Sequence, residues 1–526
     1  MAEGSPVENP RIAIPRDYNA AIDLIERNLA TGRGDKVAFI DDRTSLTYAA
    51  LAERVDRAAN GFRALGIEPE QRIVLALLDT VDFPIAFLGA IKAGMVPVPV
   101  NTVLTPQDYG FLLRDSRARA LVVSDALHDR LAPALAGQDA LRHVIVCGDK
   151  TPVGTKSFDQ LLASASPQAK AAPTTCDDPC FWLYSSGSTG APKGAVHLQS
   201  HLILTAELYA KPIIGIEASD TVYSAAKLFF AYGLGNSLTF PMAVGATSLL
   251  CADRPTPSGV SKFLKEKKPT VFYGVPTLYA SLLASPDLPK RDEVTLRRCI
   301  SAGEALPEDI GKRWTERFGV EILDGIGSTE MLHIFLSNRP GDVRYGATGK
   351  PVPGYEVRLV GDDGRLLGND EIGELQVCGP TSAAYYWNNR EKTRDTFLGP
   401  WTRSGDKYLR SSDGYYTYCG RTDDMLKVGG IYVSPFEVEA ALASHGAVLE
   451  AAVVGAFDEN RLVKPKAFIV LKDGQTASPA LAATLQDHVK SQLAPYKYPR
   501  WIEFVPELPK TATGKIQRFR LRGRTG

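Results

Sequence analysis

Tyr184-Ser-Ser-Gly-Ser-Thr-Gly-Ala-Pro-Lys193-Gly194 is the stretch from which the fold and chemistry of this chain are best approached. Its eleven residues include three glycines, three serines, a threonine and a lysine, and the apolar run Cys180-Phe-Trp-Leu-Tyr184 leads into it. The run is typical of a buried strand, and the loop forms its exit. Glycines let backbone N–H groups turn inward, hydroxyls add donors, and lysine supplies a positive charge. The composition therefore predicts a cradle for phosphate.

Two features separate this loop from a Walker A phosphate loop. The order G-x-x-x-x-G-K-[ST] is absent. Residues 195–197 continue as a second short strand, so the loop does not open a helix. A flexible surface loop is the alternative interpretation, because Gly/Ser-rich runs commonly have no ligand.

Length and composition narrow the class of protein. A chain of 526 residues is too long for one core, so we expect at least two domains. Sixty Lys and Arg balance sixty Asp and Glu, which argues against binding of nucleic acid or an anionic membrane. There is no leader-like N-terminus and no apolar run of about 18 residues, so we expect a cytoplasmic protein. Cys176 and Cys180 have no second pair beside them, which favours reduced thiols over a metal site.

The region before the loop alternates strand and helix signals. Residues 72–77 are typical of a strand, 81–93 of a helix and 96–100 of a returning strand. This rhythm predicts a parallel sheet with helices on both faces. Residues 154–178 are rich in Ala, Ser, Pro and Thr, and we expect a linker there.

Six further stretches follow the loop, and each combines small residues with a few polar ones. They are Ala225-Ala-Lys-Leu-Phe-Phe-Ala-Tyr-Gly-Leu-Gly235, Cys299-Ile-Ser-Ala-Gly-Glu304, Glu321-Ile-Leu-Asp-Gly-Ile-Gly-Ser-Thr-Glu330, Trp401-Thr-Arg-Ser-Gly-Asp406, Gly420-Arg-Thr-Asp-Asp-Met-Leu-Lys-Val-Gly-Gly430 and Leu508-Pro-Lys-Thr-Ala-Thr-Gly-Lys-Ile-Gln-Arg518. With the phosphate loop, and in this order, they resemble the motifs of the adenylate-forming (ANL) superfamily. That superfamily holds acyl- and aryl-CoA synthetases, peptide-synthetase adenylation domains and firefly-type luciferases.

The resemblance implies residues that bind ATP and Mg²⁺. Glu330 and Thr189 would hold the metal, which fits the preference of Mg²⁺ for one or two carboxylates plus phosphate oxygens. Lys193, Thr189, Glu330 and Lys515 would be the catalytic residues. The implied ATP-binding set is Ser185, Ser186, Gly187, Ser188, Thr189, Gly190, Lys193, Ala302, Gly303, Glu304, Asp324, Gly325, Ile326, Thr329, Asp406, Arg421 and Lys515.

The aromatic stretch lies where the superfamily has its acyl pocket. Many members carry a histidine there, whereas this chain has only aromatics and alanine, which favours an apolar, planar substrate. The implied pocket is Phe230, Ala231, Tyr232, Gly327, His333 and Ile334, with Ala302 at its edge. His333 is expected to be a packed wall of this pocket, with a proton carrier as the alternative.

The character of the sequence changes after residue 422. Ser434-Pro-Phe-Glu437 is a capping box with proline in the first turn and predicts a helix start. Strands at 449–456 and 464–471 and a helix at 478–493 complete a small α+β unit. By resemblance, Asp423 is the hinge, Gly429 and Gly430 lie on the CoA path, and Lys515 is the catalytic lysine. We expect an α/β protein: a large N-terminal domain of layered sheets and helices, residues 1–422, and a small mobile C-terminal domain, residues 423–526.

The stretches 181–250 and 324–334 resemble aryl-CoA ligases, the benzoate–CoA ligases above all. The resemblance implies an acid–thiol ligase that forms benzoyl-AMP and pyrophosphate and then benzoyl-CoA and AMP, in the degradation of aromatic acids. ATP, Mg²⁺ and CoA would be required, and a homodimer is left open. The alternatives are a ligase for 4-hydroxybenzoate or 2-aminobenzoate, a luciferase-like oxygenase, and a nucleotide-binding protein without catalysis.

Overall fold

The chain folds into two compact units. The computed structural model describes residues 12–185, 192–422, 424–428, 431–459, 462–494, 496–510 and 516–522. The first unit comprises Met1–Tyr345, Gly349–Glu356 and Val377–Thr402, and the second comprises Gly346–Thr348, Val357–Gln376 and Arg403–Gly526. The fold is the expected mixed α/β class, with a large N-terminal and a small C-terminal part. The domain boundary at residues 422 and 423 stays a prediction.

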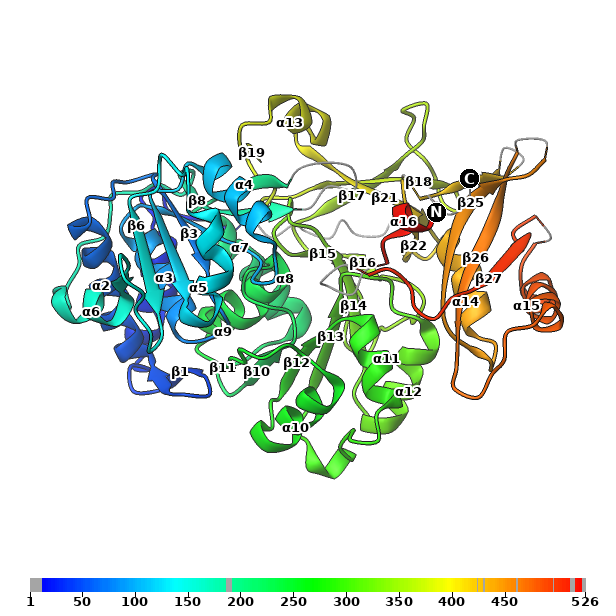
Figure 1. Cartoon of the computed structure of the whole chain (residues 1–526), viewed down its shortest axis with the longest axis horizontal. Helices are drawn as coiled ribbons and strands as arrows, with labels where there is room; N and C mark the ends of the chain where they lie inside the picture. The colour runs from blue at the N-terminus through cyan, green and yellow to red at the C-terminus, as the bar shows by residue number, and fades with distance from the viewer. Residues whose placement is uncertain are drawn as a thin grey trace, which may run out of the picture. The chain divides into compact units, whose positions relative to one another are not determined.

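The first sheet of unit 1 is fully parallel, as the β-α-β rhythm predicts. Its order is β4 (Val96–Pro99), β3 (Arg72–Ala76), β5 (Ala120–Ser124), β6 (His143–Cys147) and β7 (Lys156–Ser157). Around it lie α2 (Tyr48–Ala64), α3 (Asp82–Lys92), α4 (Pro106–Ser116), α5 (Asp125–Leu131), η1 (Ala132–Ala134) and α6 (Phe158–Ser164) (Figure 1). Both faces are covered by helices, so strands such as β5 are buried along their whole length.

The stretch expected to be a linker is partly folded, so that prediction is wrong. It contains β7 and α6, and the side chain of Ser157 caps α6 by accepting the N–H of Gln160. Phe158 and Leu162 are buried, and the Phe158 ring stacks on Phe62 of α2 at 6.4 Å. Three apolar residues, Phe158, Leu161 and Leu162, were enough to dock a short helix, and the polar composition around them concealed it.

A second sheet of unit 1 has nine strands. Its order is β16 (Lys350–Pro351), β15 (Ile334–Ser337), β14 (Ile322–Gly327), β13 (Arg298–Ala302), β12 (Val271–Gly274), β10 (Thr221–Ser224), β11 (Thr247–Leu249), β1 (Val37–Ile40) and β2 (Ser45–Thr47). The strands from β14 to β1 are parallel, and the edges are antiparallel. In Figure 1, α10 (Pro257–Lys267), α11 (Pro276–Ala284) and α12 (Glu308–Phe318) lie beside the β12–β14 side of this sheet. Trp314 of α12 is fully buried there against Phe272 and Tyr279.

The remaining helices of unit 1 gather near the other part of this sheet. They are α1 (Ala20–Leu29), α7 (His201–Thr205), α8 (Ala231–Leu234), α9 (Phe240–Val244) and the π-helical segments η2 (Ala206–Ile214) and η3 (Gly235–Thr239). The 3₁₀ turn η4 (Arg291–Glu293) lies instead beside α10, where Glu293 binds Lys265 at 2.6 Å. Gly215, just after η2, and Gly245, just after α9, adopt left-handed backbone angles that end the preceding helix.

A small antiparallel sheet carries the phosphate loop. It consists of β19 (Tyr385–Tyr386), β9 (Lys193–Leu198) and β8 (Pro179–Ser185), and α13 (Arg390–Thr396) and β20 (Phe397–Leu398) follow β19. The register pairs Ser185 with Lys193. Both predicted strands are confirmed, and the loop therefore joins two adjacent strand ends.

Unit 2 has three groups of strands. β17 (Glu356–Val360), β18 (Ile372–Cys378), β21 (Trp401–Arg410) and β22 (Tyr416–Arg421) form one sheet, and β23 (Leu426–Val428) pairs with β24 (Ile431–Val433). β25 (Val448–Phe457), β26 (Val463–Leu471) and β27 (Trp501–Phe504) form the third, with α14 (Pro435–Ala443), α15 (Pro479–Gln492) and α16 (Arg518–Arg522). The strands and helices predicted for this region are confirmed within a few residues.

The predicted capping box at α14 forms in one direction. The Ser434 side chain accepts the N–H of Glu437 at 3.3 Å. The Glu437 carboxylate instead accepts two hydrogen bonds from Lys497, at 2.6 and 2.7 Å. A cation is a stronger partner for this carboxylate than the Ser434 backbone N–H, so the reciprocal half of the box is replaced. Among the described residues, none of the helices has the length and apolar content needed to cross a membrane.

Candidate functional site

The ends of β8 and β9 define where the phosphate loop begins and ends. Ser185 closes β8 and Lys193 opens β9, and the two are direct partners in the antiparallel register. Ser186, Gly187, Ser188, Thr189 and Gly190 lie outside the described residues. The hairpin geometry nevertheless fixes both attachment points of the loop, since each is the last paired position of a buried strand.

Glu330 is held beside these strand ends. Its Oε1 accepts a hydrogen bond from the Tyr386 hydroxyl at 2.6 Å and another from Ser185 Oγ at 3.2 Å. The Nζ of Lys193 lies 5.0 Å from the centre of the Tyr386 ring, within the range of a cation–π interaction. Three predicted residues, Ser185, Lys193 and Glu330, are therefore brought together around one tyrosine.

Tyr386 is a site residue that the sequence did not single out. It is 3% exposed and lies in β19, whose register pairs it with Ala195 of β9. The N–H of Ala383, just before β19, donates to the Glu330 carbonyl at 2.7 Å. The sequence feature that could have drawn attention to Tyr386 is the aromatic run Tyr385-Tyr386-Trp387. Nothing in that run indicates that Tyr386 contacts Glu330.

The segments expected around adenine meet at one edge of the nine-stranded sheet. β13 and β14 are parallel, and their register pairs Ala302 with Gly325. Gly303 follows β13 in a left-handed conformation, with φ of 95°. The carboxyl ends of adjacent parallel strands are where ligands of such sheets bind. Contact of Ala302, Gly303, Glu304, Gly325 and Ile326 with a nucleotide stays a prediction.

Asp324 occupies the buried end of this segment. It is 5% exposed, and burial raises the pKa of its carboxyl well above the usual range. Its Oδ1 has no hydrogen-bond partner in the part of the chain that the structure describes. A buried polar atom without a partner calls for a ligand or a water molecule, which agrees with the expected position beside adenine.

His333 sits inside a cage of aromatic rings. The ring centres of Tyr209, Tyr232 and Phe240 lie 5.5, 5.6 and 4.5 Å from it. Its Nε2 lies 3.2 Å from Asn236 Oδ1 and 3.3 Å from the Tyr232 carbonyl. Both are acceptors, so Nε2 carries the proton and Nδ1 is an acceptor. Burial lowers the pKa of His333 to about 3, so the ring is neutral at physiological pH, and this arrangement favours the wall over the proton carrier.

Two glycines permit this close packing. A Cβ at Gly235 would lie 2.4 Å from His333 Cδ2, and a Cβ at Gly327 would lie 2.5 Å from the His333 carbonyl oxygen. Phe230, Ala231 and Tyr232 are partly exposed at the start of α8, while Ile334 is buried at the start of β15. The predicted pocket residues thus lie on or beside α8, β14 and β15. About a hundred positions of sequence separate α8 from the two strands.

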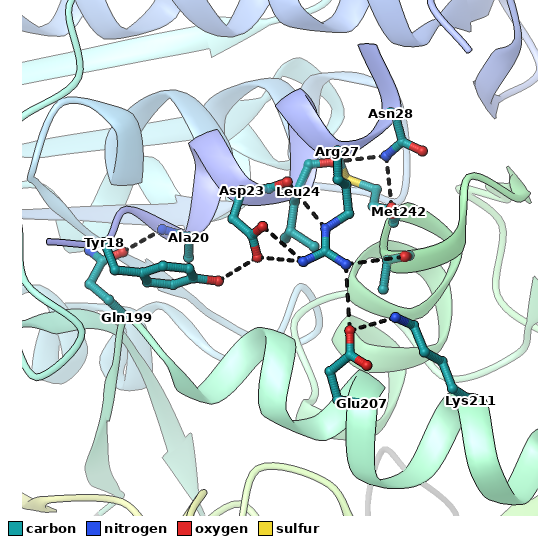
Figure 2. Close-up of polar contacts among 11 residues, drawn as sticks. Tyr18, Ala20, Asp23, Leu24, Arg27, Asn28, Gln199, Glu207, Lys211 and Met242 are labelled. Atoms are coloured by element: carbon teal, nitrogen blue, oxygen red, sulfur yellow. Dashed lines mark hydrogen bonds and ion pairs between the residues drawn. The ribbon is translucent and has the colours of Figure 1, made fainter. Parts of the chain in front are cut away.

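The back of the cage is built from irregular helices that α1 braces. Tyr209 belongs to η2, and Phe240 begins α9 directly after η3. Figure 2 shows Arg27 of α1 at the centre of the brace: it binds Asp23 at 2.7 and 2.8 Å and reaches Glu207 of η2 at 3.5 Å. π-Helical segments are uncommon and gather at functional sites. The brace therefore ties α1 to the π-helical segment that carries Tyr209.

A buried carboxylate holds the aromatic stretch from the other side. Asp79 follows β3 and accepts the N–H of Leu228 at 3.2 and 3.3 Å. Burial raises the pKa of Asp79 to about 6, while Lys227 and this hydrogen bond act in the opposite direction. Phe229 and Phe230 follow at once, their ring centres 4.4 Å apart. Asp79 therefore positions the entry to the aromatic stretch and is a second residue that the sequence did not reveal.

The site residues of unit 2 lie on neighbouring strands. The register pairs Asp406 of β21 with Arg421 of β22, and Arg421 Nη1 donates to Asp406 Oδ1 at 3.2 Å. Their predicted contacts with ribose or phosphate remain predictions. Asp423, Gly429, Gly430 and Lys515 lie outside the described residues.

The donor set around the phosphate loop suits a hard cation that binds ATP. The described residues contain no group of three or more His, Cys, Asp and Glu side chains arranged as metal ligands. A single oriented carboxylate, that of Glu330, is the pattern expected for Mg²⁺ completed by phosphate oxygens and water. Among the described residues, the fit of this site to Mg²⁺ therefore depends on Glu330. Tyr386 and Ser185 set the direction of its carboxylate.

Comparison with known proteins agrees with this geometry. The family model of AMP-binding enzymes matches residues 25–387, and the model of the AMP-binding enzyme C-terminal domain matches residues 437–515. The chain belongs to the AMP-binding enzyme family.

Three members of the AMP-binding enzyme family are particularly similar. The benzoate–CoA ligase of Thauera aromatica is 62% identical over 515 residues, with 98% of this chain and 97% of that protein covered. The crystal structure of a benzoate CoA ligase from Burkholderia xenovorans LB400 is 56% identical, with a TM-score of 0.90 and coverage of 96% and 100%. The anthranilate CoA ligase AuaEII in complex with anthranoyl-AMP is 44% identical, with a TM-score of 0.93 and coverage of 97% and 98%.

Proposed function

We propose that this chain is an ATP-dependent benzoate–CoA ligase. It joins benzoate to ATP, giving benzoyl-AMP and pyrophosphate, and then transfers the benzoyl group to CoA, giving benzoyl-CoA and AMP. The observation that carries the proposal is the convergence of Ser185, Lys193 and Glu330 at the ends of the strands that bear the phosphate loop. The similarity to the benzoate–CoA ligase of Thauera aromatica supports the choice of substrate.

The first half-reaction needs charge neutralisation and positioning. The benzoate carboxylate attacks the α-phosphorus of ATP, so an anion approaches a polyanion. Lys193 and the donors of the loop offset the phosphate charge, and Lys515 adds a second cation. The aromatic rings of Tyr209, Tyr232 and Phe240 around His333 are apolar surfaces of the kind that would pack against an unsubstituted ring.

Mg²⁺ fits the same residues. Glu330, with Thr189 of the loop, would hold it, and the bound metal would neutralise the charge that develops on the phosphates. Tyr386 and Ser185 hold the Glu330 carboxylate through bonds to one oxygen, Oε1, so Oε2 would be the oxygen left to bind the metal. The role of this chain in metal binding is therefore to fix one carboxylate in one direction.

The second half-reaction uses other groups. The CoA thiol attacks the acyl carbon of benzoyl-AMP, the bond to the phosphate oxygen breaks, and AMP leaves. We propose that rotation of the C-terminal domain about Asp423 exchanges Lys515 for the CoA path at Gly429 and Gly430. A cytoplasmic location and a homodimer stay predictions.

A second candidate substrate class is a benzoate that carries a hydrogen-bond donor, such as 4-hydroxybenzoate or 2-aminobenzoate. The buried His333 Nδ1 is an acceptor with no partner among the described residues. A hydroxyl or amino group within reach would satisfy it, and AuaEII is named for such an acid. A site built for a donor discriminates strongly against a ring without it, whereas an apolar pocket discriminates by only about 1–3 kcal/mol per small group.

The experiment is a panel of benzoate, 2-aminobenzoate, 4-hydroxybenzoate and hexanoate, with ATP, Mg²⁺ and CoA, measured as AMP formation. Benzoate should give the highest kcat/KM, and the substituted benzoates should be slower. A preference for hexanoate would overturn the proposal. Light emission or oxygen consumption would favour the luciferase-like alternative, and no pyrophosphate release would favour a non-catalytic protein.

A further inference from the structure

A buried pair of histidines lies directly behind the proposed metal site. His197 is in β9, the strand that Lys193 opens, and is fully buried; His201 begins α7 and is 3% exposed. His197 Nε2 lies 2.8 Å from the Thr329 carbonyl oxygen, and His197 Nδ1 lies 3.1 Å from His201 Nδ1. The Phe181 ring stacks on His197 at 5.2 Å. The imidazole is therefore fixed at both nitrogens and on one face.

The direction of these bonds follows from the chemistry of the partners. A carbonyl oxygen only accepts, so His197 Nε2 carries a hydrogen and donates to Thr329. In the neutral ring Nδ1 is then an acceptor. It faces His201 Nδ1 at 3.1 Å, an atom that also lies 3.4 Å from the Leu198 backbone N–H. The bond whose direction the partner fixes is the one from His197 Nε2–H to the carbonyl of Thr329.

That carbonyl belongs to the peptide group that joins Thr329 to Glu330. Because a peptide group is planar, fixing its oxygen fixes the direction in which the Glu330 Cα leaves it. The next peptide group is also held, since the Glu330 carbonyl accepts the Ala383 N–H at 2.7 Å. Both peptide groups of Glu330 are thus tied to the three-stranded sheet that bears the phosphate loop.

We propose that His197 is a positioning residue for the metal–nucleotide site: through the Thr329 carbonyl it keeps Glu330 in register with the strand of Lys193. The inference rests on the proposed function, because it assumes that Glu330 binds Mg²⁺ with ATP. His197 touches neither the metal nor the nucleotide. Its loss should weaken metal binding in the nucleotide complex and leave the later transfer of benzoyl to CoA nearly unchanged.

Two polar substitutions separate this role from simple packing. His197→Gln places an amide N–H₂ near the position of Nε2 and can still donate to Thr329. His197→Asn places it near Nδ1 and cannot reach Thr329. Phe181→Leu is the packing control, since it removes the stacked ring but none of these bonds. His201→Phe removes the polar contact at His197 Nδ1 while residue 197 stays intact.

The readout is Mn²⁺ binding with a non-hydrolysable ATP analogue, followed by electron paramagnetic resonance, together with the Mg²⁺ dependence of pyrophosphate release. His197→Asn should weaken Mn²⁺ binding about tenfold, as expected when a buried carbonyl loses its donor, and His201→Phe about threefold. His197→Gln should bind within about twofold of the unmodified protein, and Phe181→Leu should lower the unfolding temperature without changing Mn²⁺ affinity.

Unchanged Mn²⁺ affinity in His197→Asn would overturn the inference, and if that variant fails to fold, unchanged affinity in His201→Phe would do so. Equal weakening by His197→Gln and His197→Asn would also overturn it, because the donor would then be irrelevant. Failure of the proposed function gives a different result: the unmodified protein itself would release no pyrophosphate with benzoate, ATP and Mg²⁺.

Discussion

Tyr386→Phe isolates the hydrogen bond that orients the Glu330 carboxylate. The substitution removes one hydroxyl, which donates to Glu330 Oε1 at 2.6 Å, and keeps the ring under Lys193 Nζ at 5.0 Å. Tyr386 as a residue is 3% exposed, and its bond to Glu330 is partly buried. The variant should therefore fold normally and bind benzoate normally, with a less well oriented carboxylate.

The size of the effect follows from the kind of bond. A hydrogen bond to a charged group contributes about 1.5–3 kcal/mol. At 1.4 kcal/mol per factor of ten, its loss corresponds to about 10- to 150-fold in metal-dependent adenylation. Ser185 still donates to Glu330 Oε1 at 3.2 Å, so we expect the lower part of this range.

The assay is the rate of pyrophosphate release as a function of Mg²⁺ concentration at saturating benzoate and ATP. Tyr385→Phe is the matched control, since Tyr385 is the neighbouring tyrosine, is 37% exposed, and should leave the Mg²⁺ dependence unchanged. The reasoning is refuted if Tyr386→Phe folds and both its Mg²⁺ requirement and its maximal rate stay within about twofold of those of the unmodified enzyme. A twofold change is far smaller than the effect of losing a hydrogen bond to a charged group.

The remaining predictions concern charge. Glu330→Gln keeps the shape but removes the charge, so adenylation should fall steeply; restoration of the rate by excess benzoate would show instead that Glu330 lines the acid pocket. Burial raises the pKa of Asp79 to about 6 from 3.8, so the folded state holds this proton more tightly and stability should fall as pH rises from about 4 to 6. Asn does not titrate, so the free energy of unfolding of Asp79→Asn, relative to that of the unmodified protein, should rise by about 3 kcal/mol between pH 4 and pH 7. Urea unfolding measures both free energies, and a difference between them that does not change with pH would contradict this. Lys515→Ala should slow adenylation about 10²- to 10³-fold while benzoyl transfer from supplied benzoyl-AMP to CoA stays nearly unchanged, and single-turnover assays showing equal loss in both halves would exclude the two-conformation account.

Local sequence patterns predicted the strands and helices of this protein well where an element is buried along its whole length. The apolar run before the phosphate loop forms β8, and residues 193–198 form β9 as expected. The parallel sheet around β3 was predictable because its strands are apolar throughout and bounded by turn residues. α6 was missed, since its apolar residues, Phe158, Leu161 and Leu162, stand in a stretch that is otherwise small or polar.

The order of motifs along the chain was enough to name Ser185, Lys193 and Glu330, but not the residues that hold them. Tyr386 is 56 positions from Glu330, and His197 is 132 positions from Thr329. None of these supporting residues belongs to a local pattern of its own. Asp79 is likewise 149 positions from the Leu228 N–H that it accepts.

The sequence by itself therefore determined which strands form, because strand formation depends on composition and periodicity over short stretches. The resemblance of its motifs to a known family predicted that the loop binds phosphate and that Glu330 and Lys193 belong to that site. Only the tertiary structure decided the direction of the Glu330 carboxylate, the tautomers of His197 and His333, and the shape of the aromatic cage. Those properties arise where strands distant in sequence come into register, and a hydrogen bond of less than 3 Å, such as that from Tyr386 to Glu330, is specified by that register and by nothing in the local sequence.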